Sequence, residues 1–264
     1  MYEFSYHRPK TLADASKALK AASDGKLVAG GMTLIPTMKQ RLASPSDLVD
    51  LGQIAELKGI KITADMVTIG AMMTHGTVAA SADVQKAIPA LAKLADGIGD
   101  PQVRNRGTIG GSLANADPAA DYPAAVLALG ASIKTDRRDL SADQFFKGLF
   151  ETALDEGEII TSISFPVPEK AGYAKFPNPA SRYAMVGVFI AKTKDGVRVA
   201  VTGAGPSAFR VKSMEEALAK SFTPEAVAAI TVPSNGLNSD IHGSAAYRAH
   251  LITVMAKRAV AACR

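Results

Sequence analysis

The segment VRNRGTIGGSLANADPAADYPAAVLALGA, residues 103–131, decides the fold, because one stretch holds a glycine pair, a polar run and an apolar helix. Its glycine pair stands in the sequence Thr108-Ile109-Gly110-Gly111-Ser112. Adjacent glycines can adopt positive φ angles, and they lack the Cβ atoms that would keep a diphosphate away from backbone amides. The apolar residues of Asp121–Leu129 predict a helix soon afterwards. We therefore expect Gly97–Gly111 to be a glycine-bearing loop that can bind phosphate.

A second glycine pair lies in Ala29-Gly30-Gly31-Met32-Thr33, between an expected strand at Lys26–Ala29 and an expected helix at Met32–Gln40. Neither pair belongs to a GxGxxG or Walker A sequence, so a nicotinamide-binding Rossmann fold and a P-loop both match poorly. One glycine pair taken alone is more often only a tight turn. Two such segments in one chain need more explanation, and a ligand with a diphosphate would provide it.

Polar side chains follow the later glycine pair at Asn115, Asp117 and Asp121. Hydroxyl-rich ligands such as ribityl or ribose chains need this mixture of hydrogen-bond donors and acceptors. The alternative for Asp117 is that the dipeptide Asp117-Pro118 only opens the next helix. The segment thus combines a candidate phosphate site with candidate partners for sugar hydroxyls.

Composition excludes several classes of protein. The chain has 264 residues, of which 47% are hydrophobic, and this is enough for two domains with a buried core. No apolar stretch approaches the roughly 20 residues of a membrane helix, and the start MYEFSYHRPK has no signal core. The net charge is +5, but the Lys and Arg residues are dispersed among 25 acidic residues and form no nucleic-acid-binding motif. We expect a cytoplasmic protein with no membrane span and no nucleic-acid partner.

The few cysteines and histidines limit the redox chemistry of the chain. Its one cysteine, Cys263, cannot hold an iron–sulfur cluster, which takes about four thiolates. The 4 histidines show neither HExxH nor Cys/His spacing, so we expect no metal ligands. No residue is proposed as catalytic. Any redox function must therefore depend on an organic cofactor.

Local patterns predict several elements before residue 100. Thr11 should cap a helix over Leu12–Ala22, and Gly25 should end that helix. A hairpin is expected over Gly59–Gly70. The stretch Val84–Ala95 is helical in composition but should break at its proline.

The C-terminal part should begin after a proline-rich linker. Four prolines fall within Phe165–Ala180, which makes this stretch the best linker candidate. Beyond it, Val186–Lys194 and Val197–Thr202 flank Asp195-Gly196, a strong signal for a hairpin of two long antiparallel strands. A terminal helix is expected at Ala245–Ala262.

Taken together, several segments resemble the FAD-binding medium subunit of the carbon monoxide dehydrogenase and xanthine dehydrogenase-type molybdenum hydroxylases. They are Phe4-x-Tyr6-x-Arg8-Pro9, LVAGGMTLIPTMKQRL, TIGAMMTH, VRNRGTIGGSLANADPAADYPAAVLALGA and KFPNPASRYAMVGV. The resemblance covers essentially the whole chain in the expected order. Met32 departs from it, because many members have His, Asn or Gln at that position.

The resemblance implies an α+β fold in two domains. Residues 1–165 would form a vanillyl-alcohol-oxidase (PCMH)-type FAD-binding domain, made of two α/β subdomains at about 1–55 and 56–165. Residues 166–264 would form a C-terminal domain of the CO-dehydrogenase-flavoprotein type, an antiparallel sheet with helices.

The resemblance also implies a set of cofactor-binding residues. Amides of Ala29–Thr33 and Thr108–Ser112 would bind the pyrophosphate, with hydroxyls from Thr33 and Ser112, and Asn115 and Asp121 would bond the sugar hydroxyls. Ile160 would pack on the isoalloxazine and Lys175 would approach it, although Ile160 could equally be a core strand residue and His75 a surface histidine. The full set is Ala29, Gly30, Gly31, Met32, Thr33, Leu34, Gly70, Thr74, His75, Thr108, Ile109, Gly110, Gly111, Ser112, Asn115, Asp121, Ile160 and Lys175.

In function, members of this family pass electrons from [2Fe–2S] clusters through FAD to an acceptor. The resemblance therefore implies a large molybdopterin-binding subunit and a small [2Fe–2S] subunit as partners, in a dimer of heterotrimers. Molybdenum and iron would be held by those partners. Two alternatives remain open: a stand-alone FAD-dependent oxidoreductase of the same fold, and a nucleotide-binding module without enzyme activity.

Overall fold

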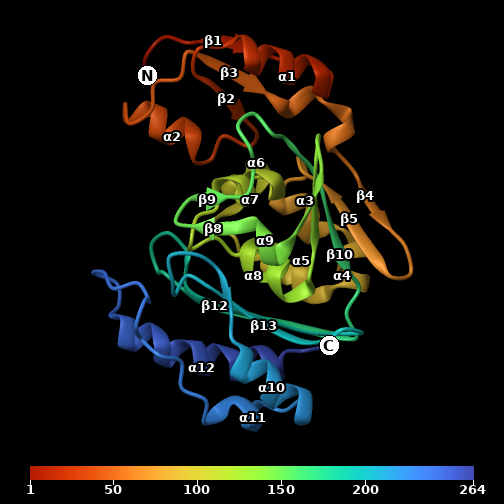
Figure 1. The fold of residues 1–264 in the computed structure, drawn as a ribbon, viewed down its shortest axis with the longest axis vertical. Coiled ribbons are helices and arrows are strands. Elements are labelled where there is room, and N and C mark those ends of the chain that lie inside the picture. The colour runs from red at the N-terminus through yellow and green to blue at the C-terminus, as the bar shows by residue number, and fades with distance from the viewer.

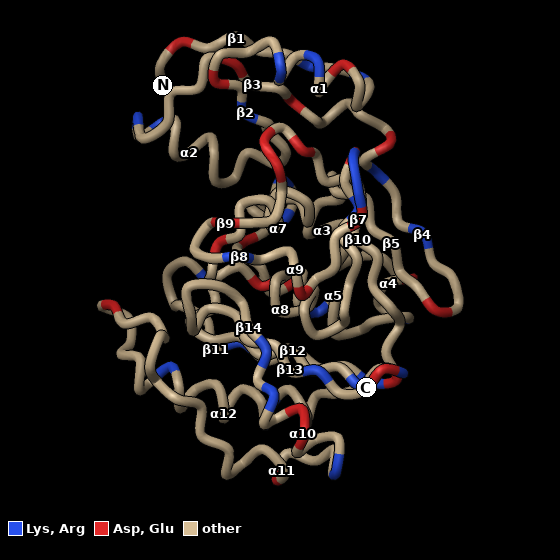
Figure 2. The backbone as a smooth tube through the Cα atoms, viewed as in Figure 1, with Lys and Arg blue, Asp and Glu red and all other residues tan.

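Three sheets follow one another along the molecule. The computed structural model describes all of residues 1–264. The three-stranded sheet lies at one end, the five-stranded sheet and most of the helices lie in the middle, and the four-stranded sheet follows, covered at the other end by the C-terminal helices (Figure 1). Basic and acidic residues are interspersed over all three parts (Figure 2). None of the helices is both long and apolar enough to cross a bilayer.

The first sheet is parallel, in the order β1-β3-β2. Its elements are β1 (Ser5–His7), α1 (Leu12–Ala21), β2 (Gly25–Val28), α2 (Leu34–Lys39) and β3 (Asp47–Asp50). Thr11 caps α1 as expected, since its Oγ1 accepts a hydrogen bond from the Asp14 amide. Gly25 does not end the helix; it begins β2. A Cβ on Gly25 would lie 2.8 Å from Leu19 Cδ1, so glycine allows the strand to begin close against α1.

The middle sheet is antiparallel throughout, in the order β4-β5-β10-β6-β7. Its strands are β4 (Ile60–Ile62), β5 (Met66–Gly70), β6 (Ser132–Thr135), β7 (Asp139–Ser141) and β10 (Ile160–Pro166), and a separate hairpin joins β8 (Phe146–Gly148) and β9 (Glu151–Thr152). The surrounding helices are η1 (Leu51–Gln53), η2 (Ala55–Leu57), α3 (His75–Ala80), α4 (Ala82–Ala87), α5 (Pro89–Asp96), α6 (Pro101–Arg106), α7 (Ile109–Asn115), α8 (Tyr122–Leu129) and α9 (Ala142–Phe145). The hairpin over Gly59–Gly70 and the helix break at Pro89 are both confirmed.

The expected loop at Gly97–Gly111 is largely helical instead. Asp100 caps α6, because its Oδ1 accepts from the Val103 amide at 2.8 Å. Thr108 caps α7 in the same way, accepting from the Gly111 amide at 3.1 Å. These helices are too short for apolar periodicity to reveal them, and only their caps indicate them.

The expected proline-rich linker is mostly strand. Sheet three, in the order β11-β12-β13-β14, begins with β11 (Lys170–Pro177), so only residues 167–169 separate it from β10. Prolines 166 and 177 lie at strand ends, and β11 is an edge strand, so none of them removes a hydrogen bond inside the sheet. The prolines therefore mark the ends of strands rather than a flexible connection.

The remaining elements of the third sheet agree with the sequence. They are β12 (Ala184–Thr193), β13 (Gly196–Thr202), β14 (Phe209–Arg210), α10 (Lys212–Lys220), α11 (Pro224–Ala228) and α12 (Ala245–Ala261). The long hairpin is confirmed, with Thr193 opposite Gly196. Helix α12 packs on β11 and β12. Contact is so close that a Cβ on Gly172 would lie 2.1 Å from the Ala259 carbonyl oxygen.

Candidate cofactor site

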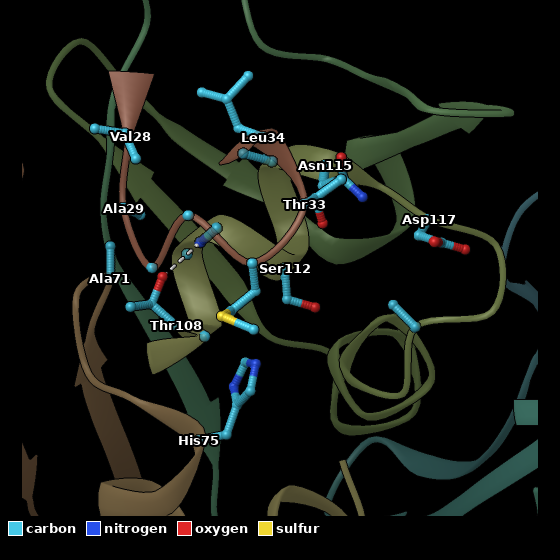
Figure 3. Close-up of a pocket in the computed structure, with 18 of the residues that line it drawn as sticks. Val28, Ala29, Thr33, Leu34, Ala71, His75, Thr108, Ser112, Asn115 and Asp117 are labelled. Atoms are coloured by element: carbon cyan, nitrogen blue, oxygen red, sulfur yellow. Dashed lines mark hydrogen bonds between the residues drawn. The ribbon is translucent and has the colours of Figure 1, made fainter. Parts of the chain in front are cut away.

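A cavity of about 550 Å³ opens where the three parts of the molecule meet. That volume lies in the range of roughly 300–1,000 Å³ typical of small-molecule and cofactor sites. Its lining includes the turn after β2 and α7 (Figure 3). Ser181–Tyr183, between β11 and β12 of the third sheet, also line it. The lining includes these residues selected from sequence: Ala29, Gly30, Gly31, Met32, Thr33, Leu34, His75, Thr108, Gly110, Gly111, Ser112, Asn115, Asp121 and Ile160.

Four of the selected residues lie outside the lining: Gly70, Thr74, Ile109 and Lys175. Gly70 ends β5, where a Cβ would lie 2.5 Å from the Leu57 carbonyl oxygen. Thr74 caps α3, and Ile109 is fully buried in the core. Each of the three is next in the chain to a lining residue, Ala71, His75 or Gly110. Lys175 lies behind the wall, and its amine bonds other protein groups.

The turn after β2 holds unused hydrogen-bond donors. None of the backbone N–H groups of Ala29–Thr33 donates a hydrogen bond within the protein. The turn is held open by Gly31, with a φ of 72°, and by Gly30, whose absent Cβ would lie 2.1 Å from the Arg106 carbonyl oxygen. Successive free N–H groups in a glycine turn form a concave site for anions. This turn fits a diphosphate.

The later glycine pair plays a different part from the one expected. Gly110-Gly111 lies in the first turn of α7, where the amides of Gly110, Gly111 and Ser112 already donate to Ala71 O, Thr108 Oγ1 and Thr108 O. Glycine is required here for close packing, since a Cβ on Gly110 would lie 2.6 Å from Ala71 Cβ. Helix α7 therefore contributes to the cavity the side chains of Ser112 and Asn115 and a surface at Gly110 and Gly111 that has no side chains.

His75 begins α3 and is 5% exposed. Figure 3 shows its ring directed toward Thr108 and Ser112. Burial, and then the positive charge of Arg104, lower the pKa of His75 to about 4. The imidazole is therefore neutral at pH 7, and the alternative that His75 is a surface histidine is wrong.

Asp121 joins the cavity to the third sheet. Its buried Oδ1 accepts hydrogen bonds from Tyr173 Oη at 2.5 Å and from Lys175 Nζ at 2.9 Å. Burial raises the pKa of the Asp121 carboxyl, and Lys175 opposes that shift. The Lys175 amine also donates to the carbonyls of Gly97 and Arg182, at 2.7 and 3.0 Å. Lys175 thus ties together three segments that surround the cavity.

Sequence reasoning missed several lining residues. Glu158 belongs to the lining and is clamped by Arg138, whose Nε and Nη2 donate to its two oxygens at 3.0 and 2.8 Å. This clamp lowers the pKa of Glu158 to about 2. Ser181–Tyr183 was given no role, although it lies within the segment KFPNPASRYAMVGV that carries the family resemblance. No local pattern could have brought it to the glycine turn, because only the pairing of β11 with β12 does so.

Comparison with known proteins agrees with this arrangement. A family model described as "FAD binding domain in molybdopterin dehydrogenase" matches residues 2–168. The chain is 37% identical to the carbon monoxide dehydrogenase medium chain of Hydrogenophaga pseudoflava, over 97% of this chain and 96% of that one. It is 38% identical to the nicotine 6-hydroxylase medium subunit of Paenarthrobacter nicotinovorans, over 97% and 95%.

A solved structure extends the match to three dimensions. Quinoline 2-oxidoreductase from Pseudomonas putida 86 superposes with a TM-score of 0.89 at 30% identity, covering 98% of this chain and 96% of that one. These matches confirm the resemblance found in the sequence and the expected α+β, PCMH-type fold class. The chain therefore belongs to the family of FAD-binding domains of the molybdopterin dehydrogenases.

Proposed function

We propose that this chain binds one FAD in the cavity and serves as the electron-transferring flavoprotein subunit of a molybdenum-dependent hydroxylase or dehydrogenase. The observation that carries the proposal is the set of unpartnered N–H groups at Ala29–Thr33. They belong to the lining of a cavity that Gly110 and Gly111 of α7 also line. Such a cradle suits the diphosphate of a dinucleotide.

Each part of the cavity has a role in holding the cofactor. Ala29–Thr33 would donate amides to the diphosphate, and Gly110-Gly111 would let it approach α7. Ser112 and Asn115 would bond hydroxyl groups of the sugar-derived chains. Asp121 would accept from another hydroxyl with Oδ2, which makes no side-chain hydrogen bond in the protein. Met32 and Leu34, on the same turn, would cover the cofactor with apolar surface.

Ile160, at the start of β10, would provide apolar surface for the isoalloxazine ring. Lys175, Gly70, Thr74, His75, Thr108 and Ile109 would shape and support the wall. When bound, FAD would supply the redox chemistry, accepting electrons from the [2Fe–2S] clusters of a small partner subunit and passing them to an acceptor. The chain's own residues hold, orient and enclose it.

The proposed role as a flavoprotein subunit also implies partner subunits and a division of this chain into domains. A large molybdopterin-binding subunit would oxidise the substrate, and the complete enzyme would be a cytoplasmic dimer of heterotrimers. Within this chain, we propose an FAD-binding domain at 1–165, with subdomains at about 1–55 and 56–165, and a C-terminal domain at 166–264. The cluster around α12 supports the second boundary, since all its members lie within residues 166–264, although the central cluster of Leu91 and Phe145 also takes in Phe189 of β12.

A ligand titration tests the cofactor assignment. The flavin-free chain is titrated with FAD, ADP and riboflavin while flavin fluorescence, or competition for it, is followed. We expect one FAD per chain, measurable competition by ADP, and much weaker binding of riboflavin, which lacks the diphosphate. If a folded chain shows no saturable binding of FAD, the assignment is wrong. Metal analysis of the native complex then tests the partners, which should bring molybdenum and iron.

A further inference from the structure

Two buried polar groups without hydrogen-bond partners lie together beneath the cavity. They are Nδ1 of His75, at the start of α3, and Oη of Tyr122, at the start of α8. Their rings are 5.4 Å apart between centroids, at an angle of 50°. More than about nine in ten buried polar groups in proteins have a partner, directly or through water. Two adjacent exceptions therefore indicate a shared arrangement.

The protonation states of the two groups limit that arrangement. Tyr122 is fully buried, and its burial, followed by the charge of Asp121, raises the pKa of its hydroxyl far above neutrality. The hydroxyl thus always carries a proton to donate. His75 is neutral, so one ring nitrogen carries a hydrogen and the other is an acceptor. Which nitrogen is the acceptor depends on the partner that the other nitrogen meets.

We propose that Tyr122 donates through one buried water to Nδ1 of His75, and thereby fixes the tautomer in which Nε2–H is offered to the cofactor as a neutral donor. A buried water needs at least two polar partners, and these side chains supply them. The donation from Nε2–H to the cofactor rests on the proposed function, because it needs FAD in the cavity. The pairing of Tyr122 with His75 through water is expected in the free chain as well.

The position of Nε2 indicates which cofactor atom it meets. A Cβ on Gly107 would lie 2.6 Å from Nε2, and Gly107 Cα in turn lies 2.8 Å from where a Cβ of Gly30 would be. Gly107 therefore packs against both His75 and the first glycine turn, and both His75 and Gly107 line the cavity. Nε2 makes no hydrogen bond within the protein. We assign its donor to a phosphate oxygen of the diphosphate, beside the free amides of Ala29–Thr33.

Nuclear magnetic resonance of the full chain with ¹⁵N-labelled histidine tests the tautomer directly. Two-bond correlations distinguish Nδ1–H from Nε2–H, and His75→Gln identifies the His75 signals. We expect Nε2–H at pH 7 with and without FAD. In Tyr122→Phe, which keeps the ring and removes the hydroxyl, the preference should disappear. Tyr247→Phe, on the exposed face of α12, is the matched control and should leave the tautomer unchanged.

Affinity supplies a second measurement. Tyr122→Phe should weaken FAD binding roughly three- to tenfold, the effect of one misdirected hydrogen bond. An Nδ1–H tautomer in the parent chain, or an unchanged Nε2–H tautomer in Tyr122→Phe, would overturn the pairing. FAD that binds without moving the Nε2 resonance would overturn the phosphate contact. If the parent shows the expected tautomer but binds no FAD, the pairing stands and the proposed function fails.

Discussion

Asp121 shows how one side chain can serve a ligand and the fold together. Its Oδ1 is committed to Tyr173 and Lys175 of β11, which leaves Oδ2 for the cavity. The sequence placed Asp121 among sugar-binding residues because it follows a glycine segment. Its second task, joining the cavity to the third sheet, could not be predicted, because the partners lie more than fifty positions away in sequence.

Replacing Asp121 by Asn tests its role toward the ligand. The variant keeps the volume and an oxygen for Lys175, but it can turn an amide donor toward the cavity in place of the carboxylate acceptor. We expect FAD affinity to fall roughly ten- to hundredfold, as for loss of a charge-assisted hydrogen bond. Isothermal titration checks this, with Asp65→Asn on the exposed β4–β5 turn as control. Unchanged affinity would mean that Asp121 only supports the wall.

The clamp on Glu158 leads to a prediction about stability. Arg138→Met removes both hydrogen bonds and leaves a buried carboxylate with only Thr135 and the Asp155 amide as donors. We expect the unfolding free energy at pH 7 to fall, by less than the usual cost of breaking a fully buried pair because the Arg138 side chain is 41% exposed. Denaturant unfolding measures it, and the neighbouring Arg137→Met should cost little.

The ion pair of Arg138 with Glu158 also determines how the stability difference between the parent and Arg138→Met depends on pH. The pKa of Glu158 is about 2 in the folded state, against an ordinary value of 4.5, so the folded state favours its ionised form. Its contribution is complete above pH 4.5 and is lost as the pH falls toward 2. The stability gap between the parent and Arg138→Met should therefore narrow over that interval. A gap that stays constant with pH would show that lost packing of Arg138 causes it.

At the scale of elements, the sequence predicted what local chemistry determines. The Thr11 cap, the break at Pro89 and the hairpin before Gly196 all follow from residues within a few positions of each other. The prediction of a linker at Phe165–Ala180 was wrong because prolines at strand ends look the same in sequence as prolines in a flexible segment. The prediction of a loop around Gly110 was wrong because glycine there allows α7 to pack against Ala71 and does not form a turn.

Gly111 tests the surface that α7 offers. A Cβ on Gly111 would lie 2.9 Å from Thr108 Oγ1 and 3.4 Å from Ala29 Cβ, so Val would crowd the space between the two glycine segments. We expect Gly111→Val to weaken FAD binding roughly tenfold or more, the equivalent of one or two lost hydrogen bonds. Flavin content after purification and a titration both measure it. Gly148→Val, on the small β8–β9 hairpin, is the control. Full FAD occupancy in a folded Gly111→Val chain would contradict the placement of the diphosphate beside Gly110-Gly111.

At the scale of the whole molecule, the cavity depends on all three sheets. The amides come from the first, His75 and α7 from the middle part, and Tyr183 from the third. Local patterns identified the two glycine pairs and the polar run after the second, whereas His75 was selected only through the family resemblance. The contribution of the third depends on the antiparallel register of β11 and β12, which carries Ser181–Tyr183 on its connecting loop. The family resemblance included that segment but gave it no role.

The last prediction concerns the division of labour between this chain and its partners. The purified chain should show no turnover with aldehydes, carbon monoxide or N-heterocycles, since oxidation of these substrates is assigned to a molybdenum centre on another subunit. A chemical reductant should nevertheless reduce its FAD, because the cofactor carries that chemistry itself. In the native complex, rapid mixing with substrate should reduce the molybdenum and iron–sulfur centres no later than the flavin, as followed by absorbance and electron paramagnetic resonance. Reduction of the flavin by substrate in the single chain would instead establish a stand-alone oxidoreductase. In the complex, reduction of the flavin before the metal centres would place substrate oxidation on this subunit.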